Sequence, residues 1–321
     1  MREILCSGQA RSLEFPYPGG MAALCWSPAG ERGELTVSLH YDGAYGMGEK
    51  YNAVNQKGHT AVNEVEEKFC FQGEKTYCPA PFFWTNTGFG LYAATDERTS
   101  FRFGEKAVCA ELPVDCRVVL FSGMPGEIIR DYMDLFGPAK LPPKWAFGPW
   151  ISANHWDSQE KVERAVAQAE EHGFPVCALV AEAWSDEATF YVFRGARYVP
   201  KPNGGAFRLE DFDFSDSPWP DPAGMVQRLH EKGIRFLLWQ IPVYKKQGPD
   251  EPLNAQNELD QADAVARGLC VHNADGSPYT IPEGYWFAGS MIPDFTNPAA
   301  EETWFSKRNY LTEMGIDGFK T

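Results

Sequence analysis

The chain has 321 residues, of which 44% are hydrophobic and 23% are charged, close to the average of globular proteins. At about 150 residues per domain, this length predicts about two domains or one large one. The composition excludes a disordered tail, a collagen-like fibre and a coiled coil. The formal net charge of −15 argues against nucleic acid as a partner, since phosphates need a surplus of Lys and Arg, and against an anionic membrane surface.

The first residues, Met1-Arg2-Glu3-Ile4, lack the basic and then apolar leader of a secreted protein. No uninterrupted apolar run approaches the roughly 18 residues that cross a bilayer. We therefore expect a cytoplasmic protein with no membrane partner. The eight cysteines contain no C-x-x-C pair and the six histidines no H-E-x-x-H motif, so we expect reduced, mostly buried thiols and neither a metal nor a cofactor.

Short segments of alternating apolar and polar residues, separated by Gly, Pro and Asn turns, dominate the chain to about residue 125. Examples are Gly33–His40, Phe82–Thr85, Gly90–Ala93 and Ala107–Leu112. Many short strands at this spacing predict an antiparallel β-sandwich, which we assign to residues 1–140. A short helix is expected over Gly126–Leu135, followed by a Pro-bearing linker that ends at Pro143.

From Lys144 onward, the pattern changes to helices that alternate with apolar strands. Asp157 and Glu160 form a predicted capping box, and Val162, Val166 and Ala169 lie on one face of the helix that follows. Two further helices are expected to begin at Asp221-Pro222 and Asn297-Pro298, and a Gly follows the expected end of each helix. The predicted strands are Trp145–Trp150, Val176–Ala181, Ile234–Trp239 and Ile316–Phe319.

Strands that are apolar on both faces and alternate with helices predict a parallel sheet covered by helices. The long connections, Glu182–Pro220 and Gln240–Pro298, follow the strands, where (β/α)8 barrels have their active sites. A doubly wound open sheet is the alternative architecture. Four βα units are half of such a barrel, and the chain ends at Thr321 inside a strand pattern. We therefore expect residues 141–321 to be the first half of a TIM barrel, truncated after its fourth strand, in a longer polypeptide.

Six short motifs occur in order from about residue 41 to the end of the chain. They are Tyr45-Gly46-Met47-Gly48-Glu49, Pro81-Phe82-Phe83 with Gly88-Phe89-Gly90, Leu141-Pro142-Pro143-Lys144-Trp145-Ala146-Phe147-Gly148, Pro220-Asp221-Pro222-Ala223-Gly224-Met225, Asp294-Phe295-Thr296-Asn297-Pro298 and Gly315-Ile316-Asp317-Gly318-Phe319-Lys320-Thr321. Together these motifs make the chain resemble glycoside hydrolase family 31, which contains α-glucosidases and α-xylosidases. The resemblance implies an N-terminal β-sandwich of the galactose-mutarotase type and a (β/α)8 barrel.

The resemblance also implies a reaction. Family members are retaining enzymes in which one Asp attacks the anomeric carbon and a second acts as acid and then base, with the two carboxyls ~5–5.5 Å apart. In the xylosidase-like branch the nucleophile follows Phe-Lys-Thr directly, so it is expected immediately after Thr321, with the acid/base further on. This implies no catalytic carboxylate within the 321 residues, and we expect the chain alone to be inactive. Glucose, xylose, galactose and N-acetylated sugars all stay open as substrates.

The resemblance also implies that residues of this chain line one side of the sugar pocket, and we call this side the sugar-binding wall. Glu182 ends the second strand, where the family usually has an Asp that contacts sugar hydroxyls, and Trp184 and Trp239 match aromatic positions of the pocket. Lys320 matches a Lys near the sugar, and a Lys inside a buried strand is costly unless it is paired. Trp150 and His155, at and after the end of the first strand, are further candidates.

We therefore expect an α-glycosidase of carbohydrate metabolism that hydrolyses oligosaccharides or α-glycosides. A non-catalytic carbohydrate-binding protein, formed by truncation, is the second interpretation, because it would keep the aromatic and acidic wall without a nucleophile. An α/β oxidoreductase would need a Gly-rich phosphate loop between a strand and a helix, and none of the Gly residues that end the predicted helices has that arrangement. The sequence leaves open the oligomeric state and the choice between hydrolysis and transglycosylation.

Overall fold

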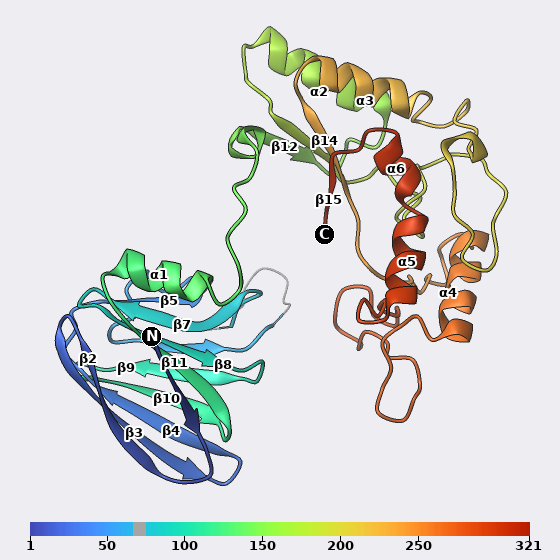
Figure 1. The fold of residues 1–321 in the computed structure, drawn as a ribbon. Helices are drawn as coiled ribbons and strands as arrows, with labels where there is room; N and C mark the ends of the chain where they lie inside the picture. Colours follow the sequence, from blue (N-terminus) through green and yellow to red (C-terminus); the bar gives the residue numbers. More distant parts are fainter. Residues whose placement is uncertain (67–74) are drawn as a thin grey trace. The chain divides into compact units, whose positions relative to one another are not determined.

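The computed structural model describes residues 1–66 and 75–321, and the chain divides into two compact units, Met1–Lys140 and Leu141–Thr321 (Figure 1). No helix among the described residues is long and apolar enough to cross a membrane. The described cysteines are free thiols; Cys6, Cys116 and Cys270 are buried, whereas Cys25 and Cys78 are exposed. Cys70 lies outside the described residues.

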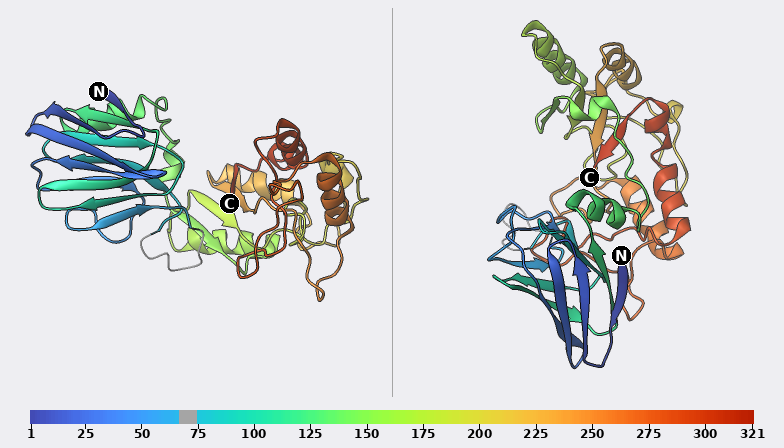
Figure 2. Two further views of the ribbon diagram at one scale, coloured as in Figure 1. Left: turned by 90° about the horizontal axis from the view of Figure 1, so that it is seen from below. Right: turned by 60° about the vertical axis from the view of Figure 1, so that its left-hand side comes forward.

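The first unit consists of two antiparallel sheets that lie face to face (Figures 1 and 2). In sheet order, the first contains β1 (Arg2–Cys6), β11 (Cys116–Ser122), β8 (Phe89–Ala94), β7 (Pro79–Thr85) and β5 (Ala44–Gly48). The second contains β2 (Arg11–Tyr17), β3 (Gly20–Ala29), β4 (Arg32–Ser38), β10 (Ala107–Pro113), β9 (Thr99–Phe103) and β6 (Thr60–Asn63). All neighbouring strands pair antiparallel, which confirms the predicted antiparallel sheets.

The core of the first unit lies between its sheets, because alternate residues of each strand are apolar and point to one face. Leu35 and Val37 of β4 are buried in one cluster with Leu120 of β11, which belongs to the other sheet. Helix α1 (Pro125–Met133) covers the opposite face of the first sheet with Ile128. This helix lies close to the predicted range.

The sheet of the second unit has parallel strands that neighbour each other in chain order. They are β12 (Trp150–Ala153), β13 (Ala178–Ala181), β14 (Arg235–Trp239) and β15 (Gly318–Lys320). A (β/α)8 barrel uses this order, whereas a doubly wound sheet reverses its order at a switch point. The sheet is open among the described residues, so it is not by itself a closed barrel.

Helices α2 (Gln159–Glu171) and α3 (Pro222–Glu231) lie side by side and cover one face of this sheet (Figure 1). Their apolar residues form one core with the residues of β13 and β14 on the face that they cover, and with helix α6 (Asn309–Glu313). The remaining elements are the short 3-10 helices η1 (Lys144–Phe147) and η2 (Leu209–Asp211), and the helices α4 (Ala255–Arg267), α5 (Pro298–Ser306) and α6 (Asn309–Glu313).

Several predicted boundaries in the second unit are wrong. The opening strand begins at Trp150, because residues 144–147 form the 3-10 helix η1. Helix α2 is capped by Ser158, whose hydroxyl accepts from the backbone N–H of Lys161, whereas Asp157 forms an ion pair with the Lys161 side chain at 2.6 Å. The helix expected from Pro298 is two helices, α5 and α6, and the sequence pattern does not predict α4.

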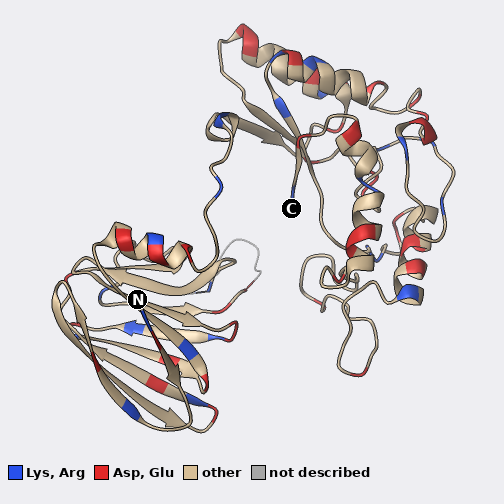
Figure 3. Cartoon of the chain, in the orientation of Figure 1, with Lys and Arg blue, Asp and Glu red and all other residues tan. Residues whose placement is uncertain are grey.

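Charged residues are distributed over both units (Figure 3). Asp and Glu lie on the helices of the second unit and on the strands and loops of the first, with Lys and Arg between them. The acidic excess is therefore a property of the whole chain and is not confined to one element.

Candidate functional site

Side-chain alternation brings polar and aromatic residues to one face of the parallel sheet, near the carboxyl ends of its strands. Ser152 pairs with Val180 between β12 and β13, and Trp239 pairs with Lys320 between β14 and β15. Glu182 lies two residues after Val180. Since successive side chains of a strand point to opposite faces, Ser152, Glu182, Trp239 and Lys320 share the face opposite to helices α2 and α3.

The carboxylate of Glu182 is held by two donors on the same oxygen. Its Oε1 accepts from Ser152 Oγ at 2.6 Å and from Lys320 Nζ at 2.7 Å. The Glu182 side chain is 13% exposed and that of Lys320 is 51% exposed. Charge-assisted hydrogen bonds to a largely buried carboxylate are stronger than those between neutral groups. The two contacts orient the carboxylate, and its Oε2 is the atom with which it can accept from a ligand.

Four aromatic rings lie next to each other at the end of β14, and we call them the aromatic cluster: Phe190, Trp239, Trp286 and Phe287. The ring of Trp239 is 5.5 Å from that of Phe190 and 5.7 Å from that of Trp286, and Phe287 contacts both Phe190 and Trp286. Trp286 is 63% exposed. Flat rings with an exposed face suit stacking on the apolar faces of sugars.

The backbone of the aromatic cluster is unusual. Phe190 has φ of 56° and Phe287 has φ of 60°, in the left-handed region that bulky residues rarely adopt. Such strain persists only where the surroundings hold it, and it concentrates at functional sites. The two loops therefore fix both rings in a conformation that the local sequence does not favour.

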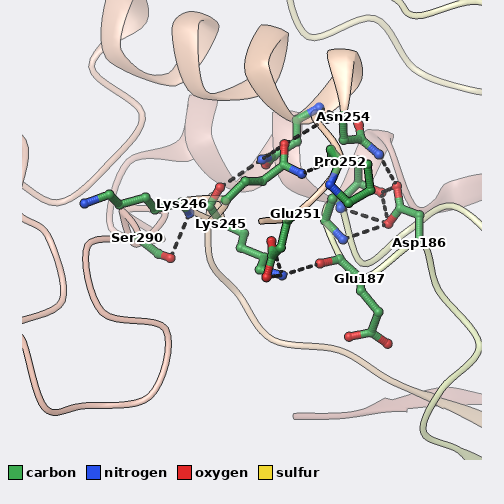
Figure 4. Close-up of polar contacts among 12 residues, drawn as sticks. Asp186, Glu187, Lys245, Lys246, Glu251, Pro252, Asn254 and Ser290 are labelled. Atoms are coloured by element: carbon green, nitrogen blue, oxygen red, sulfur yellow. Dashed lines mark hydrogen bonds and ion pairs between the residues drawn. The ribbon is translucent and has the colours of Figure 1, made fainter. Parts of the chain in front are cut away.

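Asp186 joins the loop after β13 to the start of helix α4 (Figure 4). Its Oδ1 accepts from the backbone N–H groups of Ala188 and Thr189 at 3.1 and 2.9 Å, and its Oδ2 accepts from Asn254 Nδ2 at 2.8 Å. Asn254 is also the N-cap of α4, where its side chain accepts from the N–H of Asn257. Burial raises the pKa of the Asp186 carboxyl above its ordinary value, although these hydrogen bonds lower it.

Two successive lysines connect the loop after β14 to both neighbouring loops (Figure 4). Lys245 Nζ donates to the backbone oxygen of Glu187 at 2.8 Å and pairs with Glu251 at 2.9 Å. The backbone N–H of Lys246 donates to Ser290 Oγ at 3.0 Å, four residues after Trp286. Polar contacts thus tie together the loops that carry Phe190 and Trp286. Within the described ranges, no group of three or more His, Cys, Asp or Glu is placed to hold a metal ion.

The family of the chain follows from its second unit. Residues 139–321 match the model of the glycosyl hydrolases family 31 TIM-barrel domain. The chain belongs to glycosyl hydrolase family 31.

Relatives of this family 31 chain are known as sequences and as structures. It is 36% identical to an isomaltosyltransferase from Sporosarcina globispora, over 86% of the chain and 26% of the relative. It is 34% identical to a 1,3-α-isomaltosidase from Kribbella flavida, over 94% of the chain and 43% of the relative. Its structure matches the cycloalternan-forming enzyme from Listeria monocytogenes in complex with a pentasaccharide substrate, with a TM-score of 0.87 and 34% identity, over 94% of the chain and 31% of that structure. The chain therefore spans about a quarter to somewhat under half of the length of these relatives.

The structure of the family 31 chain brings together Glu182, Trp239 and Lys320 of the predicted wall. Trp184 does not join them: its side chain is fully buried, and its indole N–H donates to the backbone oxygen of Trp239 at 2.6 Å. Trp184 thus supports the end of β14 from the core, and its place in a sugar pocket stays a prediction. Trp286, which the sequence analysis missed, places an exposed aromatic ring beside Trp239.

Within the described part of the chain, the polar and ring contacts of Trp150 and His155 are with neighbours in sequence and not with Glu182, Trp239 or Lys320. The indole N–H of Trp150 donates to the backbone oxygen of Ala146 at 3.2 Å, and its ring lies 5.5 Å from that of Trp145. His155 is exposed after β12 and its ring contacts that of Trp156. A role of these two residues in sugar binding stays a prediction.

Proposed function

We propose that this chain forms the sugar-binding wall of a retaining α-glycosidase that acts on α-linked gluco-oligosaccharides. The observation that carries the proposal is the Glu182 carboxylate, which Ser152 and Lys320 hold on one oxygen at 2.6 and 2.7 Å, on the same face as Trp239 of the aromatic cluster. An ionised carboxylate accepts hydrogen bonds from hydroxyl groups, and aromatic faces pack on the C–H faces of a sugar ring. A fixed acceptor beside flat apolar surfaces fits a pyranose.

The relatives support a narrower substrate class. The names isomaltosyltransferase and 1,3-α-isomaltosidase both refer to isomaltose units, and the structural relative holds a pentasaccharide. We therefore propose that the glycone is an isomaltosyl or glucosyl group of an oligosaccharide.

The proposal includes where the chemistry takes place. We take the four parallel strands as the first half of a (β/α)8 barrel, and the nucleophilic Asp as the residue expected directly after Thr321. A residue two positions after Lys320 in an extended strand points to the same face as Lys320, so this carboxylate would face the sugar that Glu182 holds. It would attack the anomeric carbon, while a second carboxyl protonates the leaving oxygen and then activates water.

Isothermal titration calorimetry of the 321-residue chain tests the binding site. We expect isomaltose to bind and the β-linked cellobiose to bind more weakly. Glu182→Gln should weaken isomaltose binding about tenfold, because a hydrogen bond to a charged acceptor contributes ~1.5–3 kcal/mol and ~1.4 kcal/mol is a factor of ten. Glu258→Gln, on the exposed side of α4, is the matched control and should bind like the wild type. Equal affinity of Glu182→Gln and wild type would overturn the proposed role.

Turnover tests the second part of the proposal. We expect the 321-residue chain to hydrolyse neither aryl α-glucosides nor aryl α-xylosides, because both catalytic carboxylates are proposed to lie outside it. Release of the aryl group above the buffer rate would contradict this. The coding sequence after Thr321 separates the alternatives: an Asp codon supports the glycosidase, and a stop codon supports the non-catalytic binding protein.

A further inference from the structure

Lys246 is the second of the two successive lysines after β14, and its side chain has other surroundings than that of Lys245. Lys245 Nζ pairs with Glu251 and donates to the backbone oxygen of Glu187. The side chain of Lys246 is directed away from these groups (Figure 4), and within residues 1–66 and 75–321 its ammonium has neither a hydrogen bond nor an ion pair. Since Lys246 is exposed, its three N–H donors are open to a ligand.

The stem of Lys246 is held in place by the loop that carries Trp286. The backbone N–H of Lys246 donates to Ser290 Oγ at 3.0 Å. Its side chain passes over Gly289, where a Cβ atom would lie 2.5 Å from Lys246 Cδ and 3.2 Å from Nζ. A distance of 2.5 Å is far below the ~3.5–4.0 Å at which two carbon atoms pack. Residue 289 therefore leaves room for the lysine because it is a glycine.

This path brings the ammonium close to the aromatic cluster. Gly289 lies in a tight turn, in which the backbone N–H of Ser290 donates to the backbone oxygen of Phe287 at 3.0 Å. The ring of Phe287 contacts that of the exposed Trp286. Trp286 precedes Gly289 by three residues, and three residues span at most ~11 Å. The free donor and the exposed ring therefore lie on the same short stretch of this loop.

The charges around Lys246 favour an uncharged ligand. The neighbouring Lys245 is already paired with Glu251, and the chain has a formal net charge of −15. A single exposed ion pair contributes little to binding, and an acidic chain repels anions. An ammonium also donates to neutral hydroxyl oxygens. Lys246 therefore fits a sugar that packs on the nearby ring better than it fits an anion.

We propose that Lys246 is a substrate-binding residue that donates to a hydroxyl of the second sugar of the oligosaccharide, the unit that packs on Trp286. This inference rests on the proposed function, in which Glu182 accepts from the first sugar. Glu182 lies at the end of β13, whereas Lys246 and Gly289 lie in the connections that follow the strands. The acceptor thus contacts the first unit and the donor contacts the second, and together they favour a disaccharide over a single glucose.

Isothermal titration calorimetry with isomaltose and with methyl α-glucoside tests this assignment. Lys246→Met keeps the apolar stem and removes the ammonium. We expect it to weaken isomaltose binding by the 321-residue chain about fivefold, because a charge-assisted hydrogen bond is lost, and to leave binding of the monosaccharide unchanged. Lys144→Met is the matched control. Lys144 is also exposed, but it lies in η1 before β12, at the other end of the strands, and its variant should bind both sugars like the wild type.

The possible outcomes distinguish this inference from the proposed function. Equal isomaltose affinity of Lys246→Met and wild type would overturn the role of Lys246 and leave the proposed function standing. Equal weakening of both sugars would also overturn it, because the residue would then act on the first sugar or on the fold. Failure of the wild type to bind isomaltose would contradict the proposed function itself, and the role of Lys246 with it.

Discussion

Asp186 is a buried acid whose hydrogen-bond donors are neutral: backbone N–H groups, the Thr189 hydroxyl and the Asn254 amide. Burial raises its pKa in the folded state above the ordinary value, which is about 3.9 in an unfolded chain. The folded state therefore binds this proton more tightly, and the free energy of unfolding falls as pH rises through the range just above 3.9.

The variant Asp186→Asn should lack this pH dependence, because its amide does not titrate. We expect the free energy of unfolding of the variant minus that of the wild type to increase between pH 4 and pH 6, because only the wild type loses stability from this group as the pH rises. Urea unfolding of both proteins at the two pH values measures this, and the groups that titrate in both cancel in the difference. A constant difference would show that Asp186 is ionised with an ordinary pKa.

Individual site residues were predictable where they continue a strand. Glu182 follows β13 directly, so the alternation of the strand carries it to the face opposite to α2 and α3, and the ion pair with Lys320 agrees with the need to pair a strand Lys. Trp184 lies two residues further on, but the chain leaves the sheet there and buries the indole. Trp286 lies in a long connection without periodicity, and only the folded chain brings it beside Trp239.

Helix α4 shows why one whole element escaped the sequence analysis. Its buried side consists of polar residues: Gln256, Asn257, Asp260 and Asp263, with Ala264. Gln256 donates to the backbone oxygen of Lys201 at 3.0 Å and Asn257 to that of Lys245 at 2.8 Å. Apolar periodicity detects helices that pack by hydrophobic burial, so a helix held by hydrogen bonds to loops has no such signal.

The N-cap residue of α4, Asn254, should stabilise the protein more than an ordinary N-cap does. Asn254→Ala removes a cap, which costs ~1 kcal/mol, and also takes a donor from the buried Asp186 carboxylate, which costs a further ~1–3 kcal/mol. We expect urea unfolding to show a total loss of ~2–4 kcal/mol. Ser158→Ala removes only the cap of α2 and should lose about 1 kcal/mol. Equal losses in the two variants would mean that the contact between Asn254 and Asp186 contributes nothing.

The start of the first strand of the parallel sheet could not be predicted for a different reason. An apolar run such as Trp145–Trp150 fits a strand or a tight turn equally well, because period-two alternation is absent from it. The structure forms a 3-10 helix over Lys144–Phe147 and begins the strand where the backbone first pairs with β13. Hydrogen bonding between distant segments decides this, and a local pattern does not contain it.

At the scale of the whole molecule, the first unit contains its own hydrophobic core. The cluster between its two sheets is formed only by residues within the first 140. We therefore expect a protein of residues 1–140 to fold alone, with a near-UV circular dichroism signal and one cooperative transition in urea. Gradual loss of signal without a transition would show that this unit needs the rest of the chain.

The order of the main elements was predictable at this scale, and their long connections were not. Alternating strands and Gly-terminated helices indicate a parallel sheet after residue 141, and the structure has its strands in chain order. The connections after β13 and β14 take their shape from contacts such as that between Phe190 and Phe287. These contacts join residues far apart in sequence, so a local sequence pattern does not predict them.

The adjacent residues Lys245 and Lys246 hold two different loops, one through a side chain and the other through a backbone N–H. A rigid peptide unit separates these two anchors. We expect displacement of the loop that carries Trp286 to be transmitted to the segment around Glu187 through these two contacts. Under the proposed function, an oligosaccharide that displaces one of these loops would therefore also shift the other.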